Sequence, residues 1–390
     1  MKKVSIIITV CPGHNEKQFI GSCLKSLASQ SFLTKNIEII LIGDGCKIDK
    51  DLCPQNIATR INNFQKQTGA IKARNKGLAL ANGKFIAFLD ADCVAKKDWL
   101  KNLVCKLDNE NVYCCSARTI DYQGNPDFSY RLFSSEYLLP CIGIGNVIFK
   151  KDLIDDIGFL DSNLCFGAEE FDFFWRLFFK GYQVCYVPEA IAVHYTHKTT
   201  KKYFLYGKSV RLLYKKYKNI INIDPFLELS LMKKIYKDRL QKYSNYDFYK
   251  KIKLLNIYIG YFFNTFKDKI GLLSKIHEYK NIEELIQNKE EIKPYNIYID
   301  SKLLTKSNHS IWWKIHGGIL IFNLKTQKRY KLSGISEKIW IYLQEKISSE
   351  DIIAKLLTKY KASKTTLNKD FNDFINHLLA EGILSFHEDK

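Results

Sequence analysis

Short apolar runs alternate with amphipathic stretches through the first two hundred residues, and this alternation limits the folds that the chain can adopt. The runs predicted as buried strands are VSIIITV (4–10), IEIILIGD (37–44) and KFIAFLDAD (84–92). Segments 19–30 and 70–82 carry apolar residues three and four positions apart, which predicts helices, and a polar loop is expected after residue 44. Strands that alternate with helices form a parallel sheet with helices on its faces. We therefore expect an α/β fold whose ligands bind at the carboxyl ends of the strands.

The pattern changes twice further along the chain. Residues 203–290 have the spacing of three or four amphipathic helices. From residue 295 the sequence predicts three short strands and then three helices that begin near residues 336, 349 and 364. The strand candidates are SIWWKIHG, ILIFNL and KRYKLS. We therefore expect an α/β domain over 1–205, a basic helical accessory region over 206–294 and a small winged-helix-like α+β domain over 295–390.

Composition narrows the class of protein. With 46% hydrophobic residues and 7 prolines in 390 residues, the chain can bury a core, which excludes a mainly disordered or collagen-like protein. No apolar run approaches the roughly 18 residues that span a bilayer. The start, MKKVSIIITVCPG, has too short an apolar run and no cleavage site for a secretory signal, so a buried strand is the better interpretation. The 11 scattered cysteines, without a CxxC pair, favour reduced thiols in the cytoplasm.

The net charge of +19 is concentrated in one stretch of the chain. Residues 201–253 hold 15 Lys or Arg against 4 Asp or Glu. Such a stretch favours an anionic partner, for example a sugar diphosphate, a nucleic acid, an anionic lipid or an acidic peptide. A solvated lysine-rich helical face explains the charge equally well.

Carboxylates lie at the predicted carboxyl ends of two strands. Asp44 ends the second strand, and Asp90 and Asp92 end the third. Two carboxylates one residue apart can hold a hard divalent cation, which in turn binds phosphate oxygens. A DxD pair alone is weak support for such a site, because short motifs recur by chance.

The surroundings of the DxD pair are more specific, because several motifs follow in a fixed order. They are Asn15-Glu16, Gly43-Asp44-Gly45, Ala73-Arg74-Asn75-Lys76-Gly77, Phe88-Leu89-Asp90-Ala91-Asp92 and the block GFLDSNLCFGAEEFDFFWRLFFKGYQVCYVPEAIAVH. In these motifs residues 1–205 resemble the family-2 inverting glycosyltransferases, which have the GT-A fold with a Rossmann-like parallel sheet. The resemblance implies a nucleotide-sugar donor, with a UDP-sugar as the family default, and Mg²⁺ or Mn²⁺ as cofactor.

The resemblance also implies roles for individual residues. Asp92 and His194 would be the metal ligands, with His197 as a weaker candidate, and Glu170 would be the catalytic base. The expected nucleotide-sugar site comprises Cys11, Asn15, Glu16, Asp44, Arg74, Asp90, Ala91 and Glu169, with Lys201, Lys208 and Arg211 adding positive charge at the phosphates.

The chain departs from the family pattern at several positions. Gly43 replaces the first Asp of the family's Asp-Asp-Gly, and the first loop, TVCPGHNE, is longer than usual, so the identity of the nucleotide base stays open. Glu170 stands where the family has Asp. Only one of the adjacent acids Glu169 and Glu170 can face the pocket if the segment is regular, and Asp172 with Arg176 has the spacing of a helix ion pair.

The last hundred residues carry a second resemblance. HGGILIFNLKTQKRYKLSGISEKIWIYLQEK is similar to PqqD-type domains, the peptide-recognition element of ribosomal peptide modification systems; the matching residues are Asn323, Thr326, Leu332, Ser333, Ile339, Trp340 and Leu343. Such a domain binds a leader peptide as an added strand. The strand that would pair with it comprises Lys328, Arg329, Tyr330, Lys331 and Leu332, against helix 366–381. A winged-helix domain for nucleic acid is the alternative, but the last helix is nearly neutral, so nucleic acid is the less favoured partner.

Together these features predict a cytoplasmic, metal-dependent inverting glycosyltransferase that modifies Ser, Thr or Cys of a precursor peptide, as in glycocin-type bacteriocin biosynthesis. One alternative is a transferase of surface polysaccharide or lipid-linked oligosaccharide, with residues 201–253 on an anionic membrane. A non-catalytic scaffold is a further alternative. It is disfavoured because Asp90, Asp92, Glu170 and His194 are all present.

Overall fold

The computed structural model describes most of the chain, in two compact units. The first unit comprises 1–177, 182–218 and 223–279, and the second 178–181, 219–222 and 280–390. The residues described are 4–14, 17–108, 112–124, 142–164, 167–195, 202–220, 256–257, 259–265, 267–268, 279–280, 284, 295, 297–299, 301–307, 309–315, 317–345 and 347–387. Several predictions therefore lie outside the described residues: Asn15, Glu16, His197, Lys201 and most of the helices expected over 203–290.

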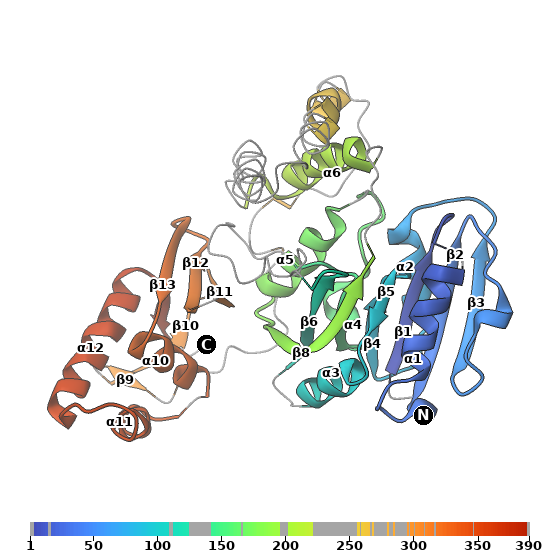
Figure 1. Cartoon of the computed structure of the whole chain (residues 1–390). Coiled ribbons are helices and arrows are strands. Elements are labelled where there is room, and N and C mark those ends of the chain that lie inside the picture. The colour runs from blue at the N-terminus through green and yellow to red at the C-terminus, as the bar shows by residue number, and fades with distance from the viewer. Residues whose placement is uncertain are drawn as a thin grey trace. The chain divides into compact units, whose positions relative to one another are not determined.

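An eight-stranded sheet organises the first unit (Figure 1). Its order is β3-β2-β1-β4-β7-β6-β8-β5. The strands are β1 (Val4–Val10), β2 (Ile37–Asp44), β3 (Ala58–Phe64), β4 (Phe85–Leu89), β5 (Cys93–Ala95), β6 (Cys114–Asp121), β7 (Asn146–Lys150) and β8 (Val184–His194). Strands β3, β2, β1 and β4 are parallel, whereas β7 is antiparallel to both its neighbours and β5 is antiparallel to β8. The expected parallel sheet is thus correct for the first four strands, and the sheet as a whole is mixed.

Helices cover both faces of this sheet. On one face α1 (Ser22–Ala28), which continues a π-helical turn η1 (Lys17–Gly21), and α3 (Trp99–Leu107) share a core with β1, β2 and β4. On the other face α2 (Ala70–Leu80) packs on β1, where Gly77 leaves room for Ile7, and α5 (Glu169–Phe179) packs on β7. Further helices described in the unit are η2 (Thr34–Asn36), η3 (Lys50–Leu52), α4 (Leu153–Ile157) and α6 (Lys202–Tyr217), and residues 259–265 are also helical.

Strand β3 corrects the expectation of a polar loop after residue 44. Its sequence, ATRINNF, has no apolar run, and several of its side chains are exposed. It nevertheless pairs with β2 from Ala58 to Phe64. Because β3 is at the edge of the sheet, only part of its surface is buried, so its sequence lacks the continuous hydrophobic signal of a central parallel strand.

The second unit contains two small sheets and three helices. One sheet has the order β14-β10-β9 and the other β11-β12-β13. The elements are β9 (Tyr298–Ile299), β10 (Lys302–Lys306), β11 (Ser310–Ile315), β12 (Gly318–Asn323), β13 (Lys328–Leu332), α10 (Ile335–Gln344), α11 (Ser349–Leu357), α12 (Lys364–Ala380) and β14 (Leu384–Phe386). Ser348 and Ser363 cap α11 and α12. The three predicted strands and three predicted helices are confirmed, whereas β9, β10 and β14 were not predicted.

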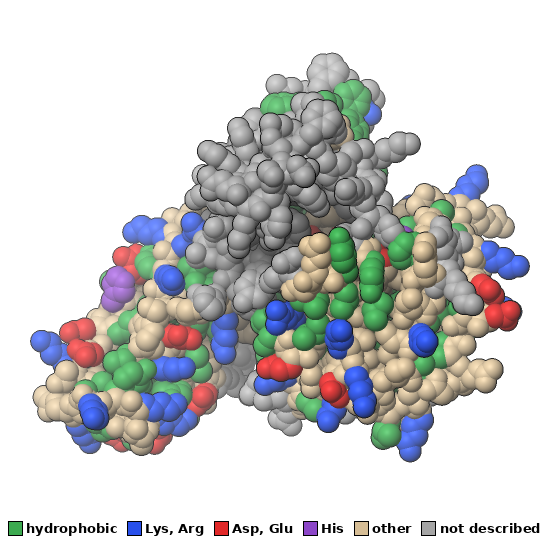
Figure 2. All heavy atoms as spheres, viewed as in Figure 1, with side chains coloured by type: hydrophobic (Ala, Val, Ile, Leu, Met, Phe, Trp, Pro, Cys, Tyr) green, Lys and Arg blue, Asp and Glu red, His purple; other side chains and the backbone are tan. Residues whose placement is uncertain are grey.

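The described surface shows how charge is distributed. On the face seen in Figure 2, Lys and Arg are interspersed with Asp and Glu over both units. The lysine-rich stretch 201–253 is described only up to residue 220, so its role stays a prediction. No helix in the described ranges has both the length and the apolar character needed to cross a membrane. The nine cysteines that the structure describes are free thiols.

Candidate active site

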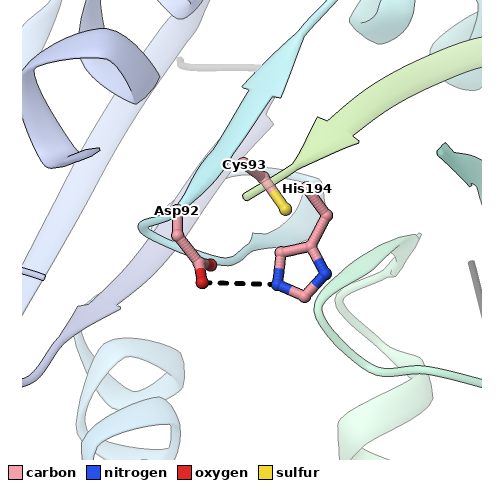
Figure 3. A group of neighbouring side chains, drawn as sticks. All are labelled: Asp92, Cys93 and His194. Carbon is pink, nitrogen blue, oxygen red and sulfur yellow. Dashed lines mark ion pairs between the residues drawn. The ribbon is translucent and has the colours of Figure 1, made fainter. Parts of the chain in front are cut away.

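Asp92, Cys93 and His194 form a cluster where β4, β5 and β8 meet (Figure 3). Asp92 follows β4 in a turn, and its carbonyl oxygen accepts a hydrogen bond of 2.9 Å from the amide of Tyr195. Nε2 of His194 lies 3.3 Å from Oδ2 of Asp92. One ligand atom from each of the three side chains lies within 4.8 Å of the others. The structure therefore brings together the two predicted metal ligands and adds a thiol that was not predicted.

The electrostatic environment favours a charged Asp92. Burial alone would raise its pKa, but the hydrogen bond and charge of His194, and then the charge of His14, lower the pKa below its usual value. Nε2 of His14 lies 3.8 Å from Oδ2 of Asp92, and Nδ1 of the same ring lies 3.5 Å from Sγ of Cys11. A carboxylate and an imidazole at this separation fit a divalent cation, since both are ordinary metal ligands. His14 was not predicted as a site residue. It lies in the first loop, and the unusual length of that loop was the sequence feature that pointed to this segment.

Arg74 connects the DxD turn to helix α5. Its Nη2 donates to Oδ1 of Asp90 at 2.9 Å, and its Nη1 donates to Oε1 of Glu169 at 3.3 Å. Burial alone would lower the pKa of the Arg74 guanidinium, but the charges of Asp90 and Glu169 outweigh burial and raise the pKa. A side chain at Gly145 would overlap the carboxylate of Asp90, so glycine there leaves space for this contact.

The two adjacent acids of α5 have different surroundings. Glu169 is buried, and its Oε2 accepts from the amide of Gly167 at 2.7 Å. Burial raises the pKa of Glu169 more than Arg74 lowers it. Glu170 is half-buried, and its Oε2 lies 3.4 Å from the amide nitrogen of Ile144. This division agrees with the expectation that the two side chains do not face one pocket together.

The end of β2 accounts for one departure from the family pattern. The carboxylate of Asp44 accepts hydrogen bonds from the amide of Thr68 at 2.5 Å, its hydroxyl at 3.0 Å and the amide of Gly69 at 2.9 Å. It thus holds the turn that precedes α2. A Cβ at Gly43 would collide with the carbonyl oxygen of Cys46 and the side chain of Asn63. The backbone here excludes the aspartate that the family pattern has at that position.

A buried ionic network joins α5 to α6. Arg176 Nη2 lies 2.9 Å from Oδ2 of Asp172, which confirms the expected helix ion pair. Asp172 Oδ1 also accepts from Lys216 Nζ at 2.6 Å and from the hydroxyl of Tyr217 at 2.9 Å. These contacts from α6 were not predicted, because nothing in the local sequence pairs residues so far apart.

Two other predicted residues have contacts that bear on their roles. Arg211 forms an ion pair of 2.6 Å with Asp268, which also binds Lys215 at 2.8 Å. Asp268 is therefore shared by two cations, and the prediction that Arg211 binds donor phosphates stays a prediction. Ala91 is buried between the two acids of the DxD turn.

Strand β13, predicted to bind peptide, is at the edge of its sheet. Among the described residues it pairs with β12 alone, from Lys328 to Leu332. Tyr330 donates its hydroxyl to Glu381, just after α12, and its ring lies 6.5 Å from that of His377. Nζ of Lys328 lies 3.5 Å from Oε2 of Glu381. The predicted strand and helix therefore contact each other, and one edge of the strand has no partner strand within the described ranges.

Two family models match the chain. Residues 5–162 match "Glycosyl transferase family 2", and residues 318–384 match "Coenzyme PQQ synthesis protein D (PqqD)". The first of these regions is therefore similar to family-2 glycosyltransferases. The second region is similar to PqqD, so the two resemblances expected from the sequence are both supported, in the expected order along the chain.

Known proteins resemble the transferase domain at low identity. Glycosyltransferase AglE of Haloferax volcanii is 25% identical over 224 residues, which cover 53% of this chain and 72% of that protein. A dolichyl N-acetyl-alpha-D-glucosaminyl phosphate 3-beta-D-2,3-diacetamido-2,3-dideoxy-beta-D-glucuronosyltransferase of Methanococcus voltae is 25% identical over 264 residues, covering 58% of this chain and 78% of that one. The structure of mannosyltransferase PcManGT from Pyrobaculum calidifontis, in complex with GDP-Man and Mn²⁺, superimposes with a TM-score of 0.52 at 15% identity, over 67% of this chain and 87% of that one. The likeness to PcManGT confirms the GT-A fold.

Proposed function

We propose that the chain transfers a sugar, with inversion, from a nucleotide-sugar to Ser, Thr or Cys of a ribosomally made precursor peptide held by its leader. The observation that carries the transferase part is the bridge formed by Arg74. It joins the DxD turn to the first turn of α5, so that the proposed metal ligand and the proposed base belong to one site. A UDP-sugar is the expected donor.

The residues of this site have distinct roles in the proposed transfer. Glu170 accepts the proton of the acceptor hydroxyl while that oxygen attacks the anomeric carbon from the face opposite the diphosphate. Arg74 and Glu169 hold the DxD turn and α5 in register. Asp92 and His194 would hold a divalent cation, Mg²⁺ or Mn²⁺, which would neutralise charge on the departing diphosphate. A cysteine acceptor depends less on the base, because part of a thiol is already ionised near neutral pH.

The PqqD domain supports a peptide as acceptor. An extended peptide can add to the open edge of β13, since main-chain hydrogen bonds give affinity and alternate side chains enter pockets. Strand β13 offers such an edge beside α12. The proposed division of the chain stays as expected from the sequence, with catalysis in 1–205, a basic accessory region in 206–294 and leader binding in 295–390. We place the enzyme in the cytoplasm, where precursor peptides are made.

A lipid-linked acceptor is the second candidate. It is favoured by the relative from Methanococcus voltae, whose name specifies a dolichyl phosphate acceptor. The PqqD match over residues 318–384 supports the peptide candidate, because a transferase that acts on a lipid has no evident use for a peptide-recognition domain.

The two candidates are separated by offering both acceptors to the full chain. Purified protein is incubated with a panel of UDP-sugars and Mn²⁺, together with either a candidate precursor, chosen as a short peptide with a Cys- or Ser-rich tail encoded beside this gene, or a polyprenyl phosphate-linked sugar. Mass spectrometry of the peptide should show the added mass of one sugar residue or more. Transfer to the lipid-linked sugar with an unmodified peptide would show that the peptide proposal is wrong.

A further inference from the structure

The thiol of Cys93 lies beside both proposed metal ligands. Strands β5 and β8 are antiparallel, and Cys93 is directly opposite His194 in their register. Side chains at opposed positions of an antiparallel pair emerge close together on one face of the sheet. Figure 3 shows the sulfur directed toward the imidazole ring, and the carboxylate of Asp92 facing a nitrogen of the same ring. Sulfur, nitrogen and oxygen donors from these residues lie within 4.8 Å of one another.

This donor set does not suit the hard cations expected from the family. Mg²⁺ takes oxygen ligands in octahedral geometry, and Mn²⁺ also prefers carboxylate, carbonyl and water. Thiolate and imidazole ligands favour zinc, and three protein ligands with one position left for water or substrate are the pattern of catalytic zinc sites. Asp92 supplies the only oxygen donor in this group of three.

Simple packing is the competing explanation for Cys93. Cys93 is 2% exposed and belongs to the core cluster of the first unit, where a thiol can act as a small apolar group. The surroundings of Cys93 nevertheless differ from those of the equally buried Cys114, which has Cys185 nearby. Over the ranges that the structure describes, the group of Cys93, Asp92 and His194 is the one with three donors close enough to hold an ion.

We propose that Cys93 is a third protein ligand of the active-site cation, and that this site binds zinc in preference to manganese or magnesium. The cysteine would coordinate as its thiolate, as metal-bound cysteines do. The inference deepens the proposed function, because it rests on that function for the role of the site, but metal binding itself can be measured without donor or acceptor.

Cobalt is a suitable probe, because thiolate coordination to Co²⁺ gives a charge-transfer band in the near ultraviolet. Co²⁺ is titrated into the full chain, the Cys93→Ser variant and two control variants. Wild type should show the band at one equivalent, and Cys93→Ser should lose it. Cys11→Ser, which removes the thiol beside His14, and Cys105→Ser, which removes an exposed thiol, should both retain it. A band that survives in Cys93→Ser, or that disappears in Cys11→Ser instead, would overturn the assignment.

Affinity gives a second measurement. Competition with a chromophoric chelator should show that Cys93→Ser weakens zinc binding by about tenfold or more, while manganese affinity changes by less than about threefold. If Cys93→Ser does not fold, the wild-type cobalt spectrum decides, since one bound Co²⁺ without a thiolate band excludes Cys93 as a ligand. An active transferase with such a spectrum would refute this inference alone. A thiolate-bound metal in a protein that transfers no sugar would leave the inference standing and refute the proposed function.

Discussion

Nη1 of Arg74 donates to Oε1 of Glu169 at 3.3 Å, so one buried guanidinium separates the roles of two adjacent acids. Glu169 is committed to this contact and to the amide of Gly167. Glu170, the next residue, is half-buried and is directed to a different partner. We therefore expect a structural role for Glu169, and these contacts are consistent with Glu170 as the proposed base.

The first prediction is that Glu170→Gln lowers kcat for a hydroxyl acceptor by about 10²–10⁴-fold, because the substitution keeps the shape but removes the base. The KM for the donor should change little. Glu169→Gln, one residue away, is the comparison: it weakens the contact with Arg74 but keeps the proposed base, so its loss of kcat should be smaller than that of Glu170→Gln. Steady-state kinetics of both variants test this, and a crippled Glu169→Gln beside a nearly normal Glu170→Gln would reverse the assignment. A milder loss in Glu170→Gln is expected if the natural acceptor is a thiol.

The second prediction is that Asp92→Ala abolishes transfer without unfolding the chain. Asp92 is the carboxylate that faces His194, so its loss removes a ligand of the proposed cation. Excess chelator should inactivate wild type in the same way, and divalent cation should restore it. Asp98→Ala provides a control and should retain activity, since Asp98 is exposed and its carboxylate accepts a hydrogen bond from the hydroxyl of Ser31. Full turnover in excess chelator would contradict metal dependence.

Local patterns were enough to predict the central elements of the transferase domain. The apolar runs at 4–10 and 37–44 coincide with β1 and β2, and the helix predicted from residue 70 begins there. These elements carry their signal in consecutive residues. Strand β3 does not, because its pairing depends on the edge that β2 offers. The antiparallel insertion of β7 between β4 and β6 likewise depends on pairing between distant segments.

The residues of the candidate site show the same contrast between local sequence signals and contacts between distant segments. Asp92 and His194 were found through ordered motifs, which record positions but not neighbours. Cys93 follows the DxD pair directly, yet its relevance depends on the register that places it opposite His194. Arg211 is a further example, because its ion pair with Asp268 joins two segments that no local pattern connects.

The third prediction concerns stability and pH. Asp172 is fully buried, and its pKa is lowered because Arg176 and Lys216 outweigh the effect of burial. As the pH falls, the Asp172 carboxylate is therefore protonated in the unfolded chain at a higher pH than in the folded protein. The stability that the carboxylate provides is present above its ordinary pKa of 3.8 and is lost as the pH falls further through the lower folded pKa.

Asp172→Asn should lower the free energy of unfolding at pH 7 by about 3–5 kcal/mol, because it leaves Arg176 buried without its counter-charge and removes one of the two carboxylates that bind Lys216. The variant should also lose less stability than wild type when the pH falls below 3.8. Urea unfolding at several pH values measures both effects. Asp161→Asn is the control, since Asp161 binds Lys216 at 2.8 Å but is less buried, so its effect should be smaller. Equal destabilisation by the two variants would show that Asp172 is not the main counter-charge of this buried network.

The last prediction tests whether the open edge of β13 holds the leader. Along an edge strand of an antiparallel sheet, amides alternate between the partner strand and the open side. Proline removes one amide, so Arg329→Pro and Tyr330→Pro remove amides that face opposite sides of β13. One of the two should disturb the pairing of β13 with β12 and lower the melting temperature. The other should leave the fold intact and remove a hydrogen bond that only an added strand would use.

The variant that keeps its melting temperature is the informative one. A leader docked on the second unit raises the effective concentration of the tethered acceptor, so losing that contact should raise the KM for full-length precursor by on the order of 10²-fold. The KM for a leaderless core peptide should not change, because that peptide gains nothing from the docking site. Free leader added in trans should inhibit wild type by competition and should not affect the variant. If both proline variants keep the wild-type KM for the precursor while one of them has a lower melting temperature, the leader does not pair with β13. A winged-helix domain would then be the better explanation of this unit, and binding of a DNA duplex to the same variants would test it.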